Sequence, residues 1–334
     1  MSYVYTVARI RGMEGRLLDA AFFSRLMDSP SIDEALKTLG ETSYAQWLAQ
    51  SEGGGFDEAI DAEMLATCLE LARFVPDEGL LALYRMPYDF HNVKVLLKSL
   101  FKVRGGDGEG RRHDLLSPLG VIPIEVLTEA IETEEWGGLP YGLPDVIPQC
   151  WTLWDQTKSA QAVELLLDRQ MYAAMLSLAE QLGTPDVVRW ARHRIDAENL
   201  RTAVRLARMG YDPTRGLPFF HEGGTFRAAD AARLLGEPQE TWPKLLSHTG
   251  IAGALDALQE GQDMRTALTD VTKALDEHMV RVLERTRFSM DAPGAVLLYL
   301  MVKEAEARNM RIALVCVAGG LDREFARRLL SHVR

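Results

Sequence analysis

Scattered histidines are the first residues of this sequence that could do chemistry, because imidazole nitrogens bind metal ions. There are seven, and none lies in HExxH or in a histidine and cysteine cluster that would supply several ligands at once. His91 is the strongest candidate, since Asp89 and Asn92 flank it. We interpret it as a structural or surface histidine, so the sequence predicts no metal site.

Acidic pairs and one glycine-rich loop are the other candidates for a site. A phosphate-binding loop needs a lysine and a hydroxyl at set positions beside its glycines. The string GGDGEG, between Val103 and Arg112, has neither. Pairs such as Asp33 with Glu34 are typical of a solvated helix face, and nothing marks one of them as buried. We therefore predict no catalytic residue, no nucleotide site and no cofactor.

One arrangement of polar residues recurs three times. An acid lies three residues before an asparagine, and a base lies two residues after it. The three sets are Asp89, Asn92 and Lys94; Asp196, Asn199 and Arg201; Glu306, Asn309 and Arg311. An asparagine inside a helix competes for backbone hydrogen bonds, so its recurrence indicates a use. The use is either packing of the repeat core, which we favour, or direct contact with a partner protein.

Amphipathic helices must position these sets. Around each asparagine, apolar residues recur with the spacing i, i+3, i+4 and i+7, which is the buried stripe of a helix. A second helical pattern precedes each one, starting at Asp61, Asp168 and Asp276. A proline separates the two patterns each time, at Pro76, Pro185 and Pro293. Each unit is therefore predicted to be a helical hairpin, and Thr184 is its expected N-cap in the second copy.

The three asparagines lie 107 and 110 residues apart, so three periods nearly fill the 334 residues. Solenoid repeats usually span about 20 to 50 residues, so each period here is the size of a small domain. We predict an all-α fold of three similar helical domains, at 1–104, 113–211 and 217–334. They are arranged either around a pseudo-threefold axis or in an open row. The Gly- and Pro-rich segment from Glu135 to Cys150 is expected to be irregular.

Composition is that of an ordinary globular chain, with 47% hydrophobic and 25% charged residues. No apolar run approaches the roughly 20 residues needed to span a bilayer. We expect no signal peptide at the N-terminus. The three isolated cysteines indicate a reducing compartment. A net charge of -11 argues against a nucleic-acid partner.

The helices that carry the asparagines resemble the three signature helices of one protein family. They read YDFHNVKVLLKSL from Tyr88, HRIDAENLRTAVRLA from His193 and KEAEARNMRIALVCVA from Lys303. The family is the C subunit of V/A-type ATPases and ATP synthases, whose eukaryotic counterpart is the d subunit. The segments YVYTVARIRGMEGRLLD, LGETSYAQWL and LPFFHEGGTF are similar to other parts of the family pattern. The resemblance thus covers essentially the whole chain.

This resemblance implies an all-helical funnel of three similar domains about a pseudo-threefold axis, without an active site. It implies a rotor adaptor, part of a hetero-oligomeric complex, held peripherally on the cytoplasmic face of the membrane by the proteolipid (c/K) ring. The adaptor would seat the D and F subunits of the central stalk and transmit torque for proton or sodium transport. The nine residues of the recurring sets carry over as repeat core only. The alternative is a soluble helical-repeat scaffold that binds other protein partners.

Overall fold

The computed structural model describes residues 3–51, 55–104, 112–258, 262–289 and 292–331. This part of the chain contains α-helices and short 3-10 helices and no strand, which confirms the all-α prediction. The glycine-rich stretch at 105–111, Gly53, Gly54 and His332 lie outside the described residues.

Six long helices follow one another in three pairs. Their bounds are α5 Phe56–Ala72 and α6 Glu78–Arg104; α9 Ala160–Leu182 and α10 Pro185–Arg208; α14 Met264–Glu284 and α15 Gly294–Gly319. The first helix of each pair begins well before the start that the sequence pattern indicated. Capping explains two of these starts, because the side chains of Ser159 and Asp263 accept hydrogen bonds from the first free amides of α9 and α14.

The three prolines lie where the sequence placed them, between the helices of each pair. Pro76 is in the loop before α6, Pro185 is the first residue of α10, and Pro293 is the N-cap of α15. A proline costs no amide hydrogen bond in the first turn of a helix. Thr184 does occupy the N-cap position of α10, but its side chain makes no capping hydrogen bond.

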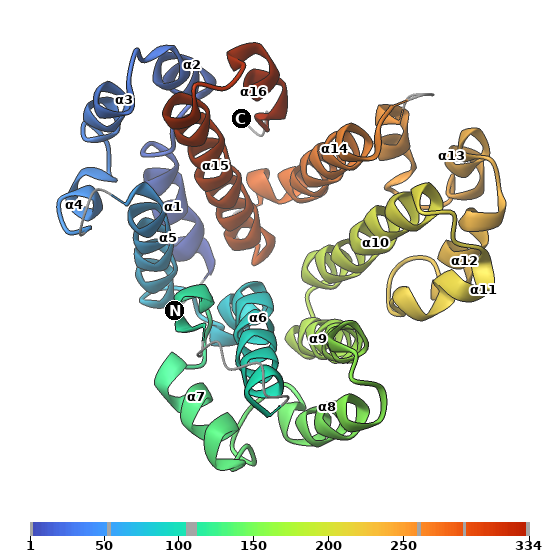
Figure 1. Cartoon of the computed structure of the whole chain (residues 1–334). Helices are drawn as coiled ribbons and strands as arrows, with labels where there is room; N and C mark the ends of the chain where they lie inside the picture. Colours follow the sequence, from blue (N-terminus) through green and yellow to red (C-terminus); the bar gives the residue numbers. More distant parts are fainter. Residues whose placement is uncertain (1–2, 52–54, 105–111, 259–261, 290–291, 332–334) are drawn as a thin grey trace.

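The six long helices form a closed circuit (Figure 1). Within the pairs, α5 packs against α6, α9 against α10, and α14 against α15. Between the pairs, α6 packs against α9, α10 against α14, and α15 against α5. We call the last three contacts the first, second and third junctions. The chain passes directly from one helix pair to the next at the first two junctions. The third junction joins the last helix pair to the first, which are far apart in the sequence.

Shorter helices surround this circuit (Figure 1). The first group is α1 Tyr3–Glu14, α2 Ala20–Asp28, α3 Ile32–Leu39 and α4 Ala45–Leu48. The middle group is η2 His113–Leu115, α7 Ile124–Thr133 and α8 Leu143–Thr157. The last group is α11 Pro213–Gly216, η3 Leu217–Phe219, α12 Ala228–Arg233, η4 Leu234–Gly236, η5 Gln239–Thr241, α13 Trp242–Leu245, η6 Ala252–Ala257, η7 Arg285–Phe288 and α16 Arg323–Leu329.

The segment from Glu135 to Cys150 is only partly irregular, which corrects the sequence prediction. Helix α8 begins at Leu143 and runs through Pro148. Pro144 lies in its first turn, where a proline is tolerated, and only Pro148 removes an internal hydrogen bond. Apolar residues of α8, among them Ile147, are buried in the same core as α9, and this burial offsets the lost bond.

The core consists of three apolar clusters. The largest draws residues from α1, α5 to α10, α14 and α15. A second lies between α10, α12 and α14. A third joins α2, α3 and Tyr44, near the start of the chain, to α15 and α16 at its end. The predicted domain boundaries follow the chain, whereas this third cluster crosses from the first segment to the last. Among the described residues, we find no helix with the length and apolar content that a membrane span requires.

Candidate functional site

Each of the three helix pairs holds one asparagine, and the chain contains no others. Asn92, Asn199 and Asn309 are buried on α6, α10 and α15. Each side chain makes two hydrogen bonds to the backbone of one later residue. Its Nδ2 donates to that residue's carbonyl oxygen, and its Oδ1 accepts from the same residue's N–H. The distances are 2.9 and 2.8 Å for Asn92 with Ser117, 2.8 and 2.8 Å for Asn199 with His221, and 3.0 and 2.9 Å for Asn309 with Ser331.

The recurring acid accepts a hydrogen bond from a second backbone N–H, which in the first two sets follows the residue held by the asparagine by a few positions. Oδ1 of Asp89 accepts from the N–H of Ile122 at 2.9 Å, and Oδ1 of Asp196 accepts from the N–H of Thr225 at 2.8 Å. Oε2 of Glu306 accepts from the N–H of Leu18 at 2.7 Å. These amides lie just ahead of α7, α12 and α2. We call each acid with its asparagine a clamp. In the first two sets both residues hold the segment that leads into the next helix, and in the third the acid holds the segment before α2 while the asparagine holds Ser331, after α16.

Two glycines allow the first two clamps to close. A Cβ atom at Gly120 would collide with the carboxylate of Asp89, and one at Gly224 would collide with that of Asp196. The backbone therefore approaches each carboxylate more closely than any larger residue permits. Both acids are fully buried, so the hydrogen bonds from the backbone N–H groups of Ile122 and Thr225 replace part of the water that the carboxylates lose.

The recurring base of each set reaches across a junction. Nζ of Lys94 pairs with Asp168 across the first junction, and Nη2 of Arg201 lies 3.0 Å from Oδ1 of Asp276 across the second. Arg311 pairs with Asp61 across the third. Each acid is the residue from which the sequence pattern of the first helix was counted. The bases and acids are partly exposed, so each pair contributes little energy and chiefly fixes the register of the two helices.

Burial raises the pKa of two clamp acids. It raises the pKa of Asp89 to about 6, although the backbone N–H groups of Ile122 and Val121 lower it in part. It also raises the pKa of Asp196 to about 6, against hydrogen bonds from the Thr225 side chain and backbone. The hydrogen-bond donors named here are neutral, and the charges of Arg85 and Arg192 are the last of the causes that lower the pKa of Asp89 and Asp196 respectively.

The third clamp is built differently, through residues that the sequence analysis did not select. Nζ of Lys303 lies 2.7 Å from Oε1 of Glu306 and 3.1 Å from Oε1 of Glu63 on α5. The hydroxyl of Tyr44 donates to Glu306 at 2.8 Å, and the indole of Trp47 donates to Glu63 at 2.7 Å. Lys303 lies among the apolar residues of α15, and this was the one feature of the sequence that could have indicated a buried ion cluster. Glu63, Tyr44 and Trp47 come from the early part of the chain, so no local pattern could name them.

A pair of histidines lies at the second junction and was also missed. The rings of His193 and His278 are 5.3 Å apart and nearly perpendicular. Burial lowers the pKa of His193 to about 4 and lowers that of His278 as well. Nδ1 of His193 lies 3.8 Å from the carboxylate of Asp196. Both rings are therefore neutral near pH 7 and act as packing residues.

The candidates for chemistry are not brought together. Nε2 of His91 lies 2.8 Å from the carbonyl oxygen of Leu115, in a hydrogen bond of the η2 loop. Within the described part of the chain, no three histidine, cysteine, aspartate or glutamate side chains are grouped as metal ligands. What the arrangement can do is mechanical, because clamps and ion pairs tie helices and loops together.

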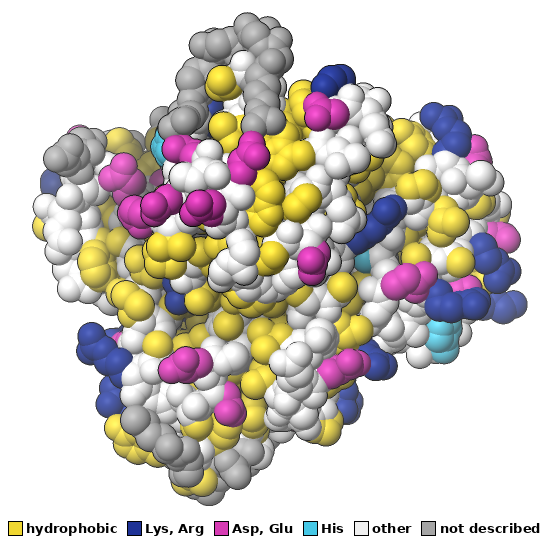
Figure 2. All heavy atoms as spheres, turned by 90° about the horizontal axis from the view of Figure 1, so that it is seen from below, with side chains coloured by type: hydrophobic (Ala, Val, Ile, Leu, Met, Phe, Trp, Pro, Cys, Tyr) yellow, Lys and Arg dark blue, Asp and Glu magenta, His cyan; other side chains and the backbone are white. Residues whose placement is uncertain are grey.

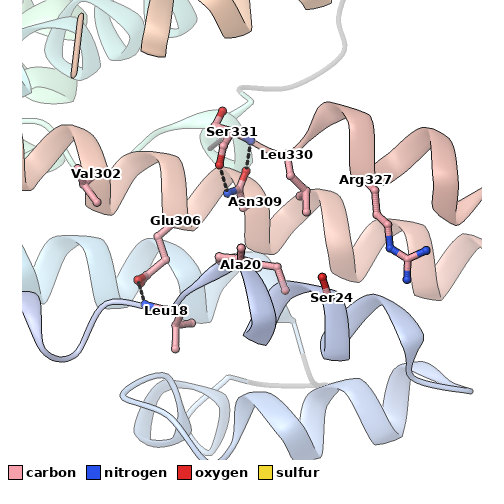
Figure 3. Close-up of a pocket in the computed structure, with 10 residues that line it drawn as sticks. Leu18, Ala20, Ser24, Val302, Glu306, Asn309, Arg327, Leu330 and Ser331 are labelled. Carbon is pink, nitrogen blue, oxygen red and sulfur yellow. Dashed lines mark hydrogen bonds between the residues drawn. The ribbon is translucent and has the colours of Figure 1, made fainter. Parts of the chain in front are cut away.

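A cavity of about 170 Å³ lies beside the third clamp (Figure 3). Leu18, Glu306, Asn309 and Ser331 are among the residues that line it. In the first two helix pairs, the chain runs without a break between the residue held by the asparagine and the residue held by the acid. In the third pair these residues are Ser331 and Leu18, so the cavity marks the place where the segment before α2 meets the segment after α16.

The fold and the clamps together define an all-α protein of linked helix pairs, whose recurring polar residues hold the structure together. The chain matches the family model described as ATP synthase (C/AC39) subunit over residues 6–329, and it belongs to that family.

Relatives with assigned names match nearly the whole chain, and each is the C subunit of its complex. The chain is 27% identical to that of the V-type ATP synthase of Thermus thermophilus, over 96% of each chain. It is 23% identical to that of the V-type sodium ATPase of Enterococcus hirae, over 92% of this chain and 91% of the relative. It is 25% identical to that of the A-type ATP synthase of Methanocaldococcus jannaschii, over 98% of this chain and 86% of the relative.

Proposed function

We propose that this chain is a non-catalytic subunit of a V/A-type ATPase or ATP synthase and acts as a rotor adaptor. The observation that carries the proposal is the family match over residues 6–329, together with relatives named as the C subunit of such complexes. In this role the chain seats the D and F subunits of the central stalk on the membrane proteolipid ring. It is held peripherally, on the cytoplasmic face of the membrane, and transmits torque for ion transport.

The packing of the helices supports a part that turns under load. Six long helices close into one circuit, and the clamps tie each intervening loop to a helix. Close-packed interiors have low compressibility and transmit strain. A circuit of three similar helix pairs suits a collar around a shaft. We therefore propose that the three predicted domains are arranged about a pseudo-threefold axis.

Surface chemistry supports docking on other proteins. Figure 2 shows one face of the molecule, on which hydrophobic side chains cover broad areas and acidic and basic side chains lie between them. Large exposed apolar side chains include Val4, Tyr5, Leu69 and Val126. Exposed apolar patches commonly mark interaction sites. A mixed face of this kind suits the polar and apolar loops of a proteolipid ring.

The test is a pull-down of the tagged chain from membranes of its source, solubilised in mild detergent. Proteolipid together with central-stalk subunits in the eluate, identified by mass spectrometry, is the expected result. Recovery of the chain alone, or with unrelated partners, would overturn the proposal.

Fractionation separates the proposal from the alternative of a soluble scaffold. A rotor adaptor sediments with membranes and leaves them in a chaotropic wash, whereas a soluble scaffold stays in the supernatant throughout. A chain that never sediments, in cells that contain the assembled complex, would favour the scaffold.

A further inference from the structure

The third junction is the one at which the chain does not connect the two helix pairs. The acid and its bound amide are 33 residues apart in the first clamp and 29 in the second. In the third clamp, Glu306 and Leu18 are 288 residues apart. Short connections keep the first two clamps near their targets at high effective concentration. The third junction must be found and held by non-covalent contacts alone.

The three junctions carry different side chains at one shared register. Six residues before each asparagine the chain has Met86, His193 and Lys303, and two residues after Asp61, Asp168 and Asp276 it has Glu63, Gln170 and His278. At the second junction these positions meet as His193 and His278. At the third they meet as Lys303 and Glu63, 3.1 Å apart. The first junction has Met86 and Gln170 at the same register, so the third alone has a cation opposite an acid there.

The Lys303 cluster is buried as completely as the apolar core. Lys303 is 2% exposed, Glu306 3% and Glu63 9%. The ammonium group also lies 4.8 Å from the centre of the Tyr44 ring. A buried charge is strongly unfavourable without its partner, and this cost penalises wrong pairings. If α15 turned this face toward the matching register of α9 or α14 in place of α5, Lys303 would meet Gln170 or His278, and Glu63 would lose its cation.

Surrounding contacts across the junction join the same elements. On the outer side, Arg327 of α16 lies 2.6 Å from Asp28, and Nη2 of Arg323 donates to the carbonyl of Ser29 at 2.9 Å. The apolar cluster of α2, α3, α15 and α16 buries side chains from both sides of the junction. Apolar contact is non-directional and does not distinguish one similar helix from another. The buried ion cluster supplies that distinction.

We infer that Lys303, held between Glu306 and Glu63, is the recognition element that closes the helical circuit at the third junction, between α15 and α5. Without it, the circuit opens there while the first and second junctions stay closed. This inference goes beyond the proposed function, because it concerns the isolated chain and needs no partner.

The test replaces Lys303 by Met in the full chain and follows amide hydrogen exchange by peptide. Methionine is the residue at the equivalent position, Met86, so the shape suits a helix of this kind. We expect amides of α2 to α5, and of α15 around Glu306, to exchange at least about tenfold faster, since local opening costs less than global unfolding. Amides of α7 and α12 should keep their rates.

His193→Met is the matched control, because it changes the same register at a junction that the chain connects. It should leave exchange in α2 to α5 unchanged, and Lys303→Arg, which keeps the cation, should stay close to the parent chain. Faster exchange spread evenly over α6 to α10, or the same effect at the third junction from His193→Met, would overturn the inference.

A second measurement decides the question if Lys303→Met does not fold. The unmodified chain is exchanged in increasing urea below the unfolding transition. Opening of α2 to α4 and α15 ahead of α6 to α10 supports the inference, and simultaneous opening of all these helices refutes it.

Discussion

At the scale of single residues, a side chain's role depends on what it reaches. The sequence marks Asn92, Asn199 and Asn309 as used, because asparagine disfavours helix interiors and yet recurs at one register. Their structural partners are backbone groups of loop residues 22 to 25 positions away. A backbone group is the same for every residue type, so no sequence pattern could have named these partners.

Replacement of Asn199 by Ala should lower the free energy of unfolding by about 2 to 4 kcal/mol, because the N–H and carbonyl of buried His221 both lose their partner. Urea unfolding followed by circular dichroism measures the change. Gln181→Ala, which removes an exposed amide on α9, is the control and should be nearly neutral. An unchanged unfolding curve combined with lost complex assembly would favour direct partner contact for Asn199.

Asp89 should make stability depend on pH in a defined window. Its pKa is about 6 in the folded chain, against an ordinary value of 3.8, so the folded state binds more protons between these values. Stability contributed by this group therefore falls as pH rises from about 4 to about 6, by up to about 3 kcal/mol. Asp89→Asn cannot titrate and should flatten that part of the curve.

The measurement for Asp89 is the free energy of unfolding in urea at several pH values between 4 and 7. The difference between Asp89→Asn and the parent chain should shift in favour of the variant as pH rises through the window. A constant difference at all pH values would show that the carboxyl group titrates alike in both states.

At the scale of helices and loops, local patterns predicted the three helix pairs and the prolines between them. The early start of α9 and α14 and the helix through Pro148 were missed, because capping and burial against α9 outweighed the composition of those segments. The ion pairs between helices were not predicted either. Lys94 and Asp168 were each recognised by recurrence, but their pairing requires knowing that α6 packs against α9.

Gly224→Ala tests whether a loop must approach its clamp this closely. The new Cβ would collide with the buried carboxylate of Asp196, so the loop or α10 must shift, at a cost of about 1 to 3 kcal/mol. Gly253→Ala is the matched control, because a Cβ there meets no atom within 4 Å. Thermal unfolding of both variants is the measurement, and equal melting temperatures would contradict the close approach.

At the scale of the whole molecule, α2 and α3 from the early part of the chain complete the surroundings of the last long helix, α15. Phe23 and Met27 of α2 are buried in one cluster with Met310 and Leu314 of α15. The sequence could not show this, since an internal repeat indicates similar units but not which unit lies beside which. Closure of the circuit is therefore a property of the full chain that no single repeat contains.

A chain divided into residues 1–51 and 55–334 should reassemble. The second piece presents the apolar face of α15 and the buried side of Lys303, and the first supplies the apolar side chains and the Leu18 amide that cover them. Apolar burial of this kind stabilises association by roughly 25 cal/mol per Å² before the entropy cost of joining two molecules. Co-expression with a tag on the short piece, followed by capture, should recover both.

Two variants make the capture specific. Phe23→Asp in the short piece places a charge in the apolar cluster, where Phe23 is 3% exposed, and should abolish recovery of the long piece. Lys303→Met in the long piece leaves the apolar face intact but removes the cation that lies 4.8 Å from the centre of the Tyr44 ring of the short piece, so recovery should fall without being lost. If the two soluble pieces did not associate at all, the contacts of α2 and α3 with α15 and α16 would depend on the chain connection that leads into α5, and the non-covalent account of these contacts would be wrong.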